Sequence, residues 1–274
     1  MNLQPCLLCK SAYTEAILKG EFEITRCLCC QFEYVRDAAN FLGQDWFDEY
    51  YSRRKNNNSD NLNALREKQY VVDASVIYDY ISEGSYILDV GCSNGKFISI
   101  ISNLKNNLHC FGVDIDGSAI AQANRDFTDI ATFEKKGLLA FDGTMKFDLI
   151  IFRGTFQYLG SELHDSMRYL KTLLSEGGRI VVFSLPSTDA FMYKLLAEKW
   201  ALFHPEMNLM FNENSIRALA AQHGYKVKSL TYPYLEDVYS NPIEDYQNIR
   251  DIITGLSEKS TPFWGSIMTV VMGR

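Results

Sequence analysis

Alternating strand and helix patterns run through most of this chain of 274 residues, and they limit its possible folds more than any other feature. From about residue 62, short apolar runs typical of strands alternate with helical runs. The expected strands are 86–90, 109–113, 131–134, 147–152 and 178–184, and the expected helices are 62–81, 95–104, 118–125 and 161–174. Such alternation gives a parallel sheet with helices on both faces. The sequence therefore predicts an α/β fold.

The last ninety residues show a different pattern of expected elements. The patterns predict helices at 191–202, 213–223 and 243–256, and strands at 226–232 and 266–272. Asn212 is placed to cap the second of these helices, and Gly224 is placed to end it.

The stretch 87–97, Ile-Leu-Asp-Val-Gly-Cys-Ser-Asn-Gly-Lys-Phe, is a strand that runs into a glycine-bearing turn and then a helix. Such a turn lets backbone N–H groups approach a ligand at the carboxyl edge of the sheet. A dinucleotide turn would need a second glycine at Ser93, so the pyrophosphate fingerprint is not met. Asp114, at the end of the next strand, is placed to accept hydrogen bonds from both hydroxyls of an adenosine ribose. Taken alone, the turn is also compatible with a simple tight connection, but Asp114 and the alternation of strands and helices favour a ligand site.

These residues resemble the class I S-adenosylmethionine (SAM)-dependent methyltransferases. Their first motif reads hydrophobic-Leu-Asp-hydrophobic-Gly-Cys-Gly-x-Gly, and here Ser93 replaces its middle glycine. Residues 147–159 are similar to the fourth-strand motif of the family, and 173–182 to the Gly-Gly turn before the fifth strand. The resemblance covers about residues 62–274. It implies a Rossmann-like sheet, mostly parallel with an antiparallel last strand, and SAM as cofactor.

The resemblance also implies which residues bind the cofactor. In the family, the positions matched by Asp89, Gly91, Cys92 and Gly95 surround the methionine end, and the position matched by Asp114 holds the ribose. The expected cofactor-binding set is completed by Ile115, Gly137, Leu138 and Arg153.

Gly137 and Leu138 fall where an adenine contact is expected, although the usual acidic residue is absent there. Arg153 ends the fourth strand at the level of the ligand. It could hold a phosphate or carboxylate by a bidentate contact, or pair with a neighbouring acid.

Five of the seven cysteines fall within the first thirty residues. Cys6-x2-Cys9 and Cys27-x2-Cys30 offer four thiolates on two tight turns, which suits a tetrahedral Zn²⁺ ion. All four positions would be filled by protein sulfur, so the expected zinc is structural. Cys29 complicates the assignment because it also lies close to Cys27. In a reducing compartment such pairs favour metal over disulfide.

Methyltransferases of sugar and cell-surface polysaccharide biosynthesis carry a similar four-cysteine module before the cofactor domain. Residues 200–211 and 216–225 also look like a segment common in those enzymes. The expected domains are a zinc-binding module at 1–37, a helix and polar linker or lid at 38–61, and a SAM-binding methyltransferase domain at 62–274. We expect no counterpart of the large C-terminal domain of the sugar C-methyltransferases, and therefore O- or N-methylation.

Transfer of a methyl group to a hydroxyl needs a general base within hydrogen-bond reach. His204, in an aromatic loop before Pro205, is the first candidate, and Tyr158, after the fourth strand, is its rival. The family segment usually has His where Met207 stands, and Glu-His is often seen where Gln157-Tyr158 stands. These departures leave an imported general base in doubt.

Charge favours a small-molecule substrate, such as a nucleotide-linked sugar, over nucleic acid. Lys plus Arg number 27 against 34 Asp plus Glu, a formal charge of −7, whereas nucleic-acid binders carry basic surfaces. An RNA methyltransferase that uses the zinc module is the alternative, and a non-catalytic protein-binding module on a degenerate methyltransferase fold is the third hypothesis. No basic start followed by an apolar stretch and no apolar run of about 18 residues is found, so we expect a cytoplasmic protein without a membrane span.

Overall fold

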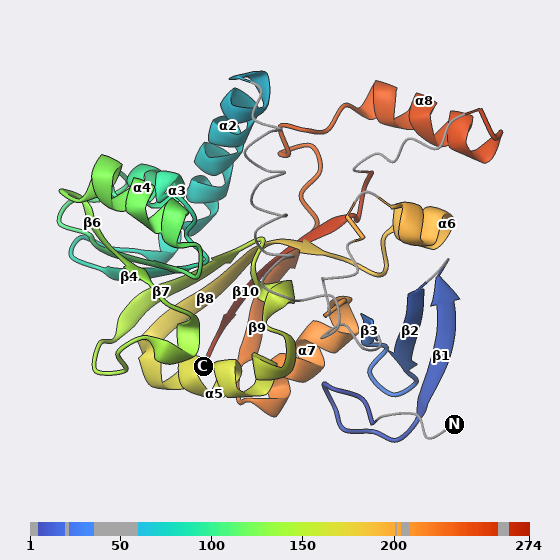
Figure 1. The fold of residues 1–274 in the computed structure, drawn as a ribbon, viewed down its shortest axis with the longest axis horizontal. Helices are drawn as coiled ribbons and strands as arrows, with labels where there is room; N and C mark the ends of the chain where they lie inside the picture. Colours follow the sequence, from blue (N-terminus) through green and yellow to red (C-terminus); the bar gives the residue numbers. More distant parts are fainter. Residues whose placement is uncertain (1–4, 20–21, 36–59, 201, 204–208, 257–262) are drawn as a thin grey trace. The chain divides into compact units, whose positions relative to one another are not determined.

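The computed structural model describes residues 5–19, 22–35, 60–200, 202–203, 209–256 and 263–274 (Figure 1). Within it, the chain forms two compact units, each assembled from three stretches of sequence. Unit 1 takes residues 1–68, 186–219 and 232–268, and unit 2 takes 69–185, 220–231 and 269–274. The domain boundaries expected at residues 37 and 61 stay a prediction.

Unit 2 is organised around a seven-stranded sheet in the order β6-β5-β4-β7-β8-β10-β9. Four neighbouring pairs, β6-β5, β5-β4, β4-β7 and β7-β8, are parallel, whereas β10 and β9 are antiparallel. The strands are β4 (Tyr86–Val90), β5 (His109–Asp114), β6 (Ala131–Lys135), β7 (Phe147–Arg153), β8 (Leu174–Pro186), β9 (Lys226–Thr231) and β10 (Ile267–Gly273). The predicted α/β class, with its mostly parallel sheet and antiparallel last strand, is confirmed.

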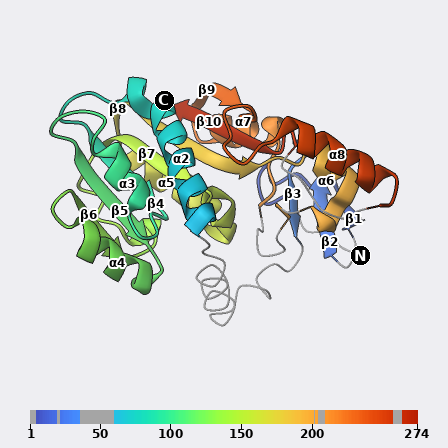
Figure 2. The ribbon, with the colours of Figure 1, turned by 90° about the horizontal axis from the view of Figure 1, so that it is seen from above.

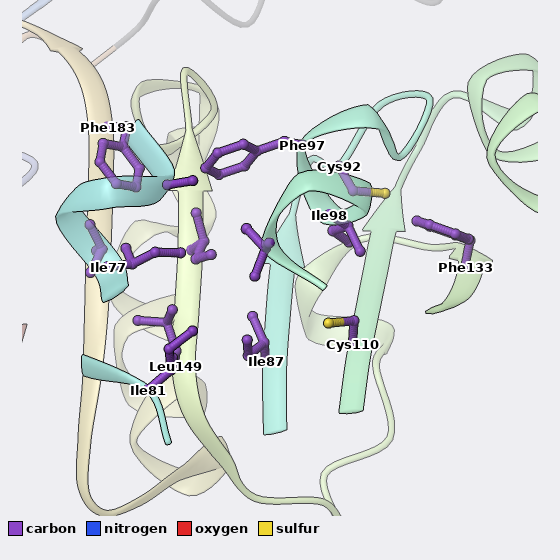
Figure 3. Close-up of a cluster of buried hydrophobic side chains, with 14 of the residues drawn as sticks. Ile77, Ile81, Ile87, Cys92, Phe97, Ile98, Cys110, Phe133, Leu149 and Phe183 are labelled. Carbon is purple, nitrogen blue, oxygen red and sulfur yellow. The ribbon is translucent and has the colours of Figure 1, made fainter. Parts of the chain in front are cut away.

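Helices cover both faces of this sheet. The helices α2 (Asp60–Ile77), α3 (Lys96–Ile101) and α4 (Gly117–Phe127) lie on one face, and α5 (Leu163–Leu173) lies on the other (Figure 1). Figure 3 shows the core between the first face and its helices, where Ile87 and Leu149 of the strands meet Ile77 and Ile98. Burial of such side chains stabilises the sheet by about 1.5–3 kcal/mol each.

Unit 1 contains the antiparallel sheet β1-β2-β3, with β1 (Thr14–Lys19), β2 (Phe22–Cys27) and β3 (Glu33–Val35). The other elements of this part of the chain are α6 (Phe191–Leu196), α7 (Glu213–Gln222), which extends into unit 2, and α8 (Pro242–Ile253). A shared core includes Ile24 and Val35 of the small sheet, Tyr193 of α6, Ile249 of α8, and Trp200, which follows α6. The cysteine-bearing segment therefore completes its core with later parts of the chain.

Several element boundaries differ from those predicted. The helix expected at 191–202 is helical only from Phe191 to Lys199, and Ala197 within it has a positive φ of 51°. The strand expected from Gly178 begins at Leu174, and β1 was not predicted. The predicted caps of α7 are confirmed, because Asn212 Oδ1 accepts the Ser215 N–H at 2.8 Å and Gly224 has a φ of 74°.

The expected helix and linker of residues 38–61 lie outside the described residues, except for the start of α2. Within the described part of the chain, we find no helix that is both long enough and apolar enough to cross a membrane.

Candidate functional site

The candidate site lies where the strand order of the sheet reverses. From β4 the chain proceeds through β5 to β6 on one side and then continues with β7 on the other side of β4. In open α/β sheets, ligands bind outside the carboxyl ends of the strands at this reversal. The glycine turn that follows β4 meets the loop that follows β7 there, and Arg153 ends β7 at the same edge.

The turn after β4 has little room for side chains. Gly91, Ser93 and Gly95 have φ values of 81°, 51° and 76°, so all three are left-handed. A Cβ added to Gly91 would lie 2.2 Å from Cγ2 of Thr155, whose hydroxyl donates to the Val90 carbonyl at 2.8 Å. At Gly95, a Cβ would lie 2.7 Å from the Phe133 ring. The two glycines are therefore required by both backbone conformation and close packing.

Asp89, at the end of β4, is a buried carboxylate whose bonding is incomplete. It is 1% exposed, and its Oδ1 has no hydrogen-bond partner among the described residues. Burial raises its pKa to about 7; the nearby Arg153 opposes this rise and Asp114 adds to it. A buried polar atom without a partner is costly. A ligand that places a hydrogen-bond donor or a cation beside Asp89 Oδ1 would remove this cost.

Asp114, at the end of the neighbouring strand β5, is held by the backbone. Its Oδ2 accepts the Ser93 N–H at 2.8 Å, and its Oδ1 accepts the Asp116 N–H at 2.9 Å. These bonds tie the end of β5 to the glycine turn and fix the orientation of the carboxylate. Ile115, which follows, is 50% exposed and offers an apolar surface beside it.

Arg153 pairs with an acid, the second of the two alternatives left open by the sequence. Its Nε donates to Asp73 Oδ2 of α2 at 2.7 Å, and Asp73 also accepts a bond from Gln69 at 2.8 Å. The guanidinium carbon lies 4.4 Å from the centroid of the Tyr70 ring and 5.7 Å from that of Phe97. Asp73 and Tyr70 were not identified from the sequence.

Gly137 and Leu138, two other expected cofactor contacts, differ from each other in how open their surroundings are. A Cβ built on Gly137 meets nothing within 4 Å, so this glycine borders open space, whereas Leu138 is 5% exposed. Cys92 is also buried, and burial raises the pKa of its thiol well above the ordinary value. Cys92 is therefore suited to packing rather than to nucleophilic chemistry.

Of the two candidates for a general base, only Tyr158 lies within the described residues. Tyr158 lies in a single 3-10 turn (Phe156–Tyr158) directly after β7, where it is half-buried and its N–H donates to the Thr155 carbonyl. His204 lies outside the described residues. Beside Tyr158, Gln157 is 5% exposed, and its Oε1 has no hydrogen-bond partner among the described residues.

The four cysteines of the two Cys-x2-Cys pairs come together in unit 1. The sulfur atoms of Cys6, Cys9, Cys27 and Cys30 all lie within 4.8 Å of one another. Cys6 and Cys30 are 3.8 Å apart, and Cys9 and Cys27 are 3.5 Å apart. A tetrahedral Zn²⁺ ion with bonds of about 2.3 Å needs sulfur separations of about 3.8 Å. The cluster thus has the dimensions of a zinc site.

Both turns of the cluster have the same backbone geometry. The N–H of Lys10 donates to the Cys6 carbonyl at 3.0 Å, and the N–H of Gln31 donates to the Cys27 carbonyl at 2.9 Å. Lys10 and Gln31 are also both left-handed, with φ values of 62° and 57°. Cys29 is exposed, outside the cluster, with its sulfur 3.1 Å from Ser11 Oγ. The second turn therefore repeats the first, with Cys27 and Cys30 at the positions of Cys6 and Cys9, and Cys29 does not take part.

Residues 50–230 match a family model described as a methyltransferase domain. Curated relatives include a carboxy-S-adenosyl-L-methionine synthase of Campylobacter jejuni subsp. jejuni serotype O:23/36 (strain 81-176). It is 25% identical over 177 residues, which cover 62% of this chain and 69% of the relative.

Solved structures share the fold. The magnesium protoporphyrin IX methyltransferase of Synechocystis PCC 6803 with bound SAH superposes with a TM-score of 0.56 at 14% identity, covering 86% of this chain and 97% of that chain. The plantazolicin methyltransferase BpumL in complex with SAH gives a TM-score of 0.53 at 16% identity, covering 85% and 91%. The family match spans the glycine turn, Asp89, Asp114 and Arg153, and on this ground the chain belongs to the methyltransferase domain family.

Proposed function

We propose that the protein binds S-adenosylmethionine beside β4 and β7 and transfers its methyl group to a small molecule. The carboxyl group of Asp89 is the observation that carries this proposal. It is buried at the strand-order reversal with Oδ1 unpartnered among the described residues, and it stands where the first motif of the similar methyltransferases has its aspartate. An ammonium group placed there would supply the missing donor and the compensating charge.

The buried charges of the site, with more carboxylates than cations, also favour binding of this cofactor. Asp89, Asp114 and Asp73 are each at most 7% exposed, and Arg153 is the cation beside them. SAM carries a sulfonium, an ammonium and a carboxylate, so its net charge is positive. A cationic ligand therefore offsets the excess of buried carboxylates.

Each residue has a role that follows from its position. Asp89 would accept from the ammonium, and Asp114, held by two backbone N–H groups, would accept from the ribose hydroxyls. Ile115, which is 50% exposed, would offer apolar surface for the adenine, with the buried Leu138 packed behind the site, and the Asp73-bound Arg153 would hold the carboxylate. When bound, SAM supplies an activated methyl group on its sulfonium; the protein mainly aligns the acceptor with it.

We infer a small-molecule acceptor rather than RNA, because the chain has a formal charge of −7 and no basic surface is expected from its composition. A nucleotide-linked sugar or polysaccharide precursor is the proposed class. Tyr158 and His204 are the proposed groups for accepting a proton from a hydroxyl or amine acceptor.

The cysteine cluster supports a further part of the proposal, one structural Zn²⁺ ion held by Cys6, Cys9, Cys27 and Cys30. Three backbone N–H groups approach the sulfurs at 3.4 Å, from Leu8 and Cys9 to Cys6 and from Cys29 to Cys27. Such N–H groups orient and stabilise thiolates. A metal held by four sulfurs has no open position, so its role would be to join the two turns.

A transfer assay tests the proposed function. We expect label from methyl-labelled SAM to appear in a nucleotide sugar or another small molecule of a panel that also contains ribosomal RNA and small acids. The Asp89→Ala variant should lose this transfer. Label found only in RNA, or failure of the wild type to bind SAM in calorimetry, would overturn the proposal.

A second candidate activity is suggested by the Campylobacter jejuni relatives, which are named carboxy-S-adenosyl-L-methionine synthases. One observation favours it: Arg153 could hold an additional carboxylate near the cofactor, since only its Nε is used by Asp73. Mass spectrometry of the cofactor after incubation distinguishes the two activities. Carboxylated SAM would support this candidate, whereas SAH would support methyl transfer.

Cofactor affinity should depend on pH through Asp89. Its pKa is raised to about 7 by burial, so the carboxyl is partly protonated near neutrality. A cation binds the carboxylate and therefore displaces the proton. We expect the affinity for SAM to fall about tenfold per pH unit below 7 and to level off above it. Calorimetry from pH 5.5 to 8.5 measures this, and a flat profile would contradict the role of Asp89.

A further inference from the structure

Exposed large apolar side chains lie close together along one stretch of unit 1. Seven of the eighteen exposed large hydrophobic residues in the described part of the chain lie between residues 235 and 264. The most exposed are Leu256 at 78%, Ile243 at 74%, Tyr246 at 69% and Leu235 at 67%. Concentrated apolar exposure of this kind marks interaction sites in soluble proteins.

Helix α8 carries part of this surface. Helix α8 lies beside α6 (Figure 2). On one side of α8, Ile249 is buried in the core of unit 1 and Asp245 accepts the Tyr234 hydroxyl at 2.6 Å. Another side carries Ile243, Tyr246, Arg250 and Ile253, all exposed. We call these four residues the α8 stripe. Their spacing of three, four and three residues is that of a coiled-coil seam.

The spacing of the α8 stripe is the same when read in either direction. Its midpoint is position 248, so an antiparallel copy of the helix places Ile243 opposite the partner's Ile253. The same register places Tyr246 opposite the partner's Arg250, where a guanidinium can lie on an aromatic ring. A two-fold interface requires this kind of self-complementarity. We propose that the α8 stripe is the contact between two copies of this chain, paired antiparallel about position 248.

Charge does not oppose this pairing. Two chains of formal charge −7 repel each other in general, but none of the four stripe residues is acidic. The positions that would flank the seam, Gln247 and Thr254, are also neutral. Arg250 bonds Asp251 on its own helix at 3.1 Å, which lowers its cost of burial against a partner.

The exposed area of the α8 stripe reaches the lower size limit of a specific interface. Ile243, Tyr246 and Ile253 are 74%, 69% and 61% exposed, and the Arg250 side chain is 66% exposed. At on the order of 200 Å² for each large side chain they present roughly 540 Å² per copy, or roughly 1,100 Å² for the pair, against about 1,000 Å² needed for a specific contact. Tyr and Arg are also the residue types that carry much of the binding energy in such contacts.

Light scattering and sedimentation of the full chain test the proposal. The wild type is expected to be a dimer. Ile243→Lys and Ile253→Glu should each weaken the pair by at least about 30-fold, because each buries an unpaired charge. The double variant I243K/I253E should recover dimerisation, since the antiparallel register places each Lys opposite a Glu of the partner.

The outcomes separate this register from its alternatives. Tyr13, 72% exposed in the cysteine-bearing segment, provides a control matched to Tyr246 at 69%. Tyr13→Lys should leave the dimer intact, and Tyr246→Lys should disrupt it. A monomeric wild type, a dimer unaffected by Tyr246→Lys, or a double variant no better than the singles would each overturn the proposal. Circular dichroism confirms that each variant is folded.

Discussion

Replacing Asp114 with alanine is expected to weaken SAM binding at least about 100-fold, because two charge-assisted hydrogen bonds to the ribose are lost together. The carboxylate is fixed at the end of β5 by the N–H groups of Ser93 and Asp116, so it is already oriented for a ligand. Calorimetric titration with SAM measures the loss. A cofactor analogue without ribose hydroxyls should bind the wild type and the variant equally.

Asp148 provides a matched control. It lies at the opposite, amino-terminal end of β7, where its carboxylate accepts the Tyr86 N–H at 3.0 Å and the Ser175 hydroxyl at 2.8 Å. Asp148→Ala removes a carboxylate with a similar bonding pattern and is expected to lower stability without changing cofactor affinity. Equal loss of affinity in the two variants would show that Asp114 acts only on stability.

Loss of one cluster cysteine is expected to release the metal and lower the thermal midpoint of unit 1 by at least about 10 °C, since a metal site of this type stabilises its fold by several kcal/mol. The wild type should contain one zinc ion per chain, and Cys9→Ser should contain none. Cys29→Ser is the matched control, because its exposed sulfur lies outside the cluster. Metal analysis and calorimetry measure both quantities.

Loss of the metal should also change the packing around Tyr193 of α6 and Trp200. Glu33 of β3, buried between Arg26 and Tyr193, accepts a hydrogen bond from the Tyr193 hydroxyl at 2.5 Å, and the Tyr193 ring lies 5.5 Å from that of Trp200. Loss of the cluster is therefore expected to expose Trp200 and shift its fluorescence to longer wavelength. The shift should be absent when Trp200→Phe is combined with Cys9→Ser. An unchanged spectrum in Cys9→Ser alone would argue against this coupling.

The core of the candidate site could be predicted because it depends on local sequence. A strand, a glycine turn and a helix determine where Asp89 and Gly91 lie, and the end of the next parallel strand determines where Asp114 lies. The four cysteines could be predicted for the same reason, since each pair forms one tight turn. The metal and cofactor contacts themselves remain predictions.

The remaining features depend on contacts between distant residues. The bond between Arg153 and Asp73 joins positions 80 residues apart, and nothing in the pattern of α2 distinguishes Asp73 from a solvent-facing acid. Likewise, the end of α6 depends on the left-handed Ala197, a residue type that favours helix. Tertiary structure overrides local propensity at both positions.

The position of β10 has a consequence for folding during synthesis. β10 is made after both β8 and β9, yet it lies between them in the sheet. Until it emerges from the ribosome, β8 has an open edge and β9 has no neighbour, and unpaired strand edges promote aggregation. The sheet therefore cannot be completed as the chain is made. Its assembly waits for residues 267–273, and until then the open edge of β8 is exposed to pairing with other chains.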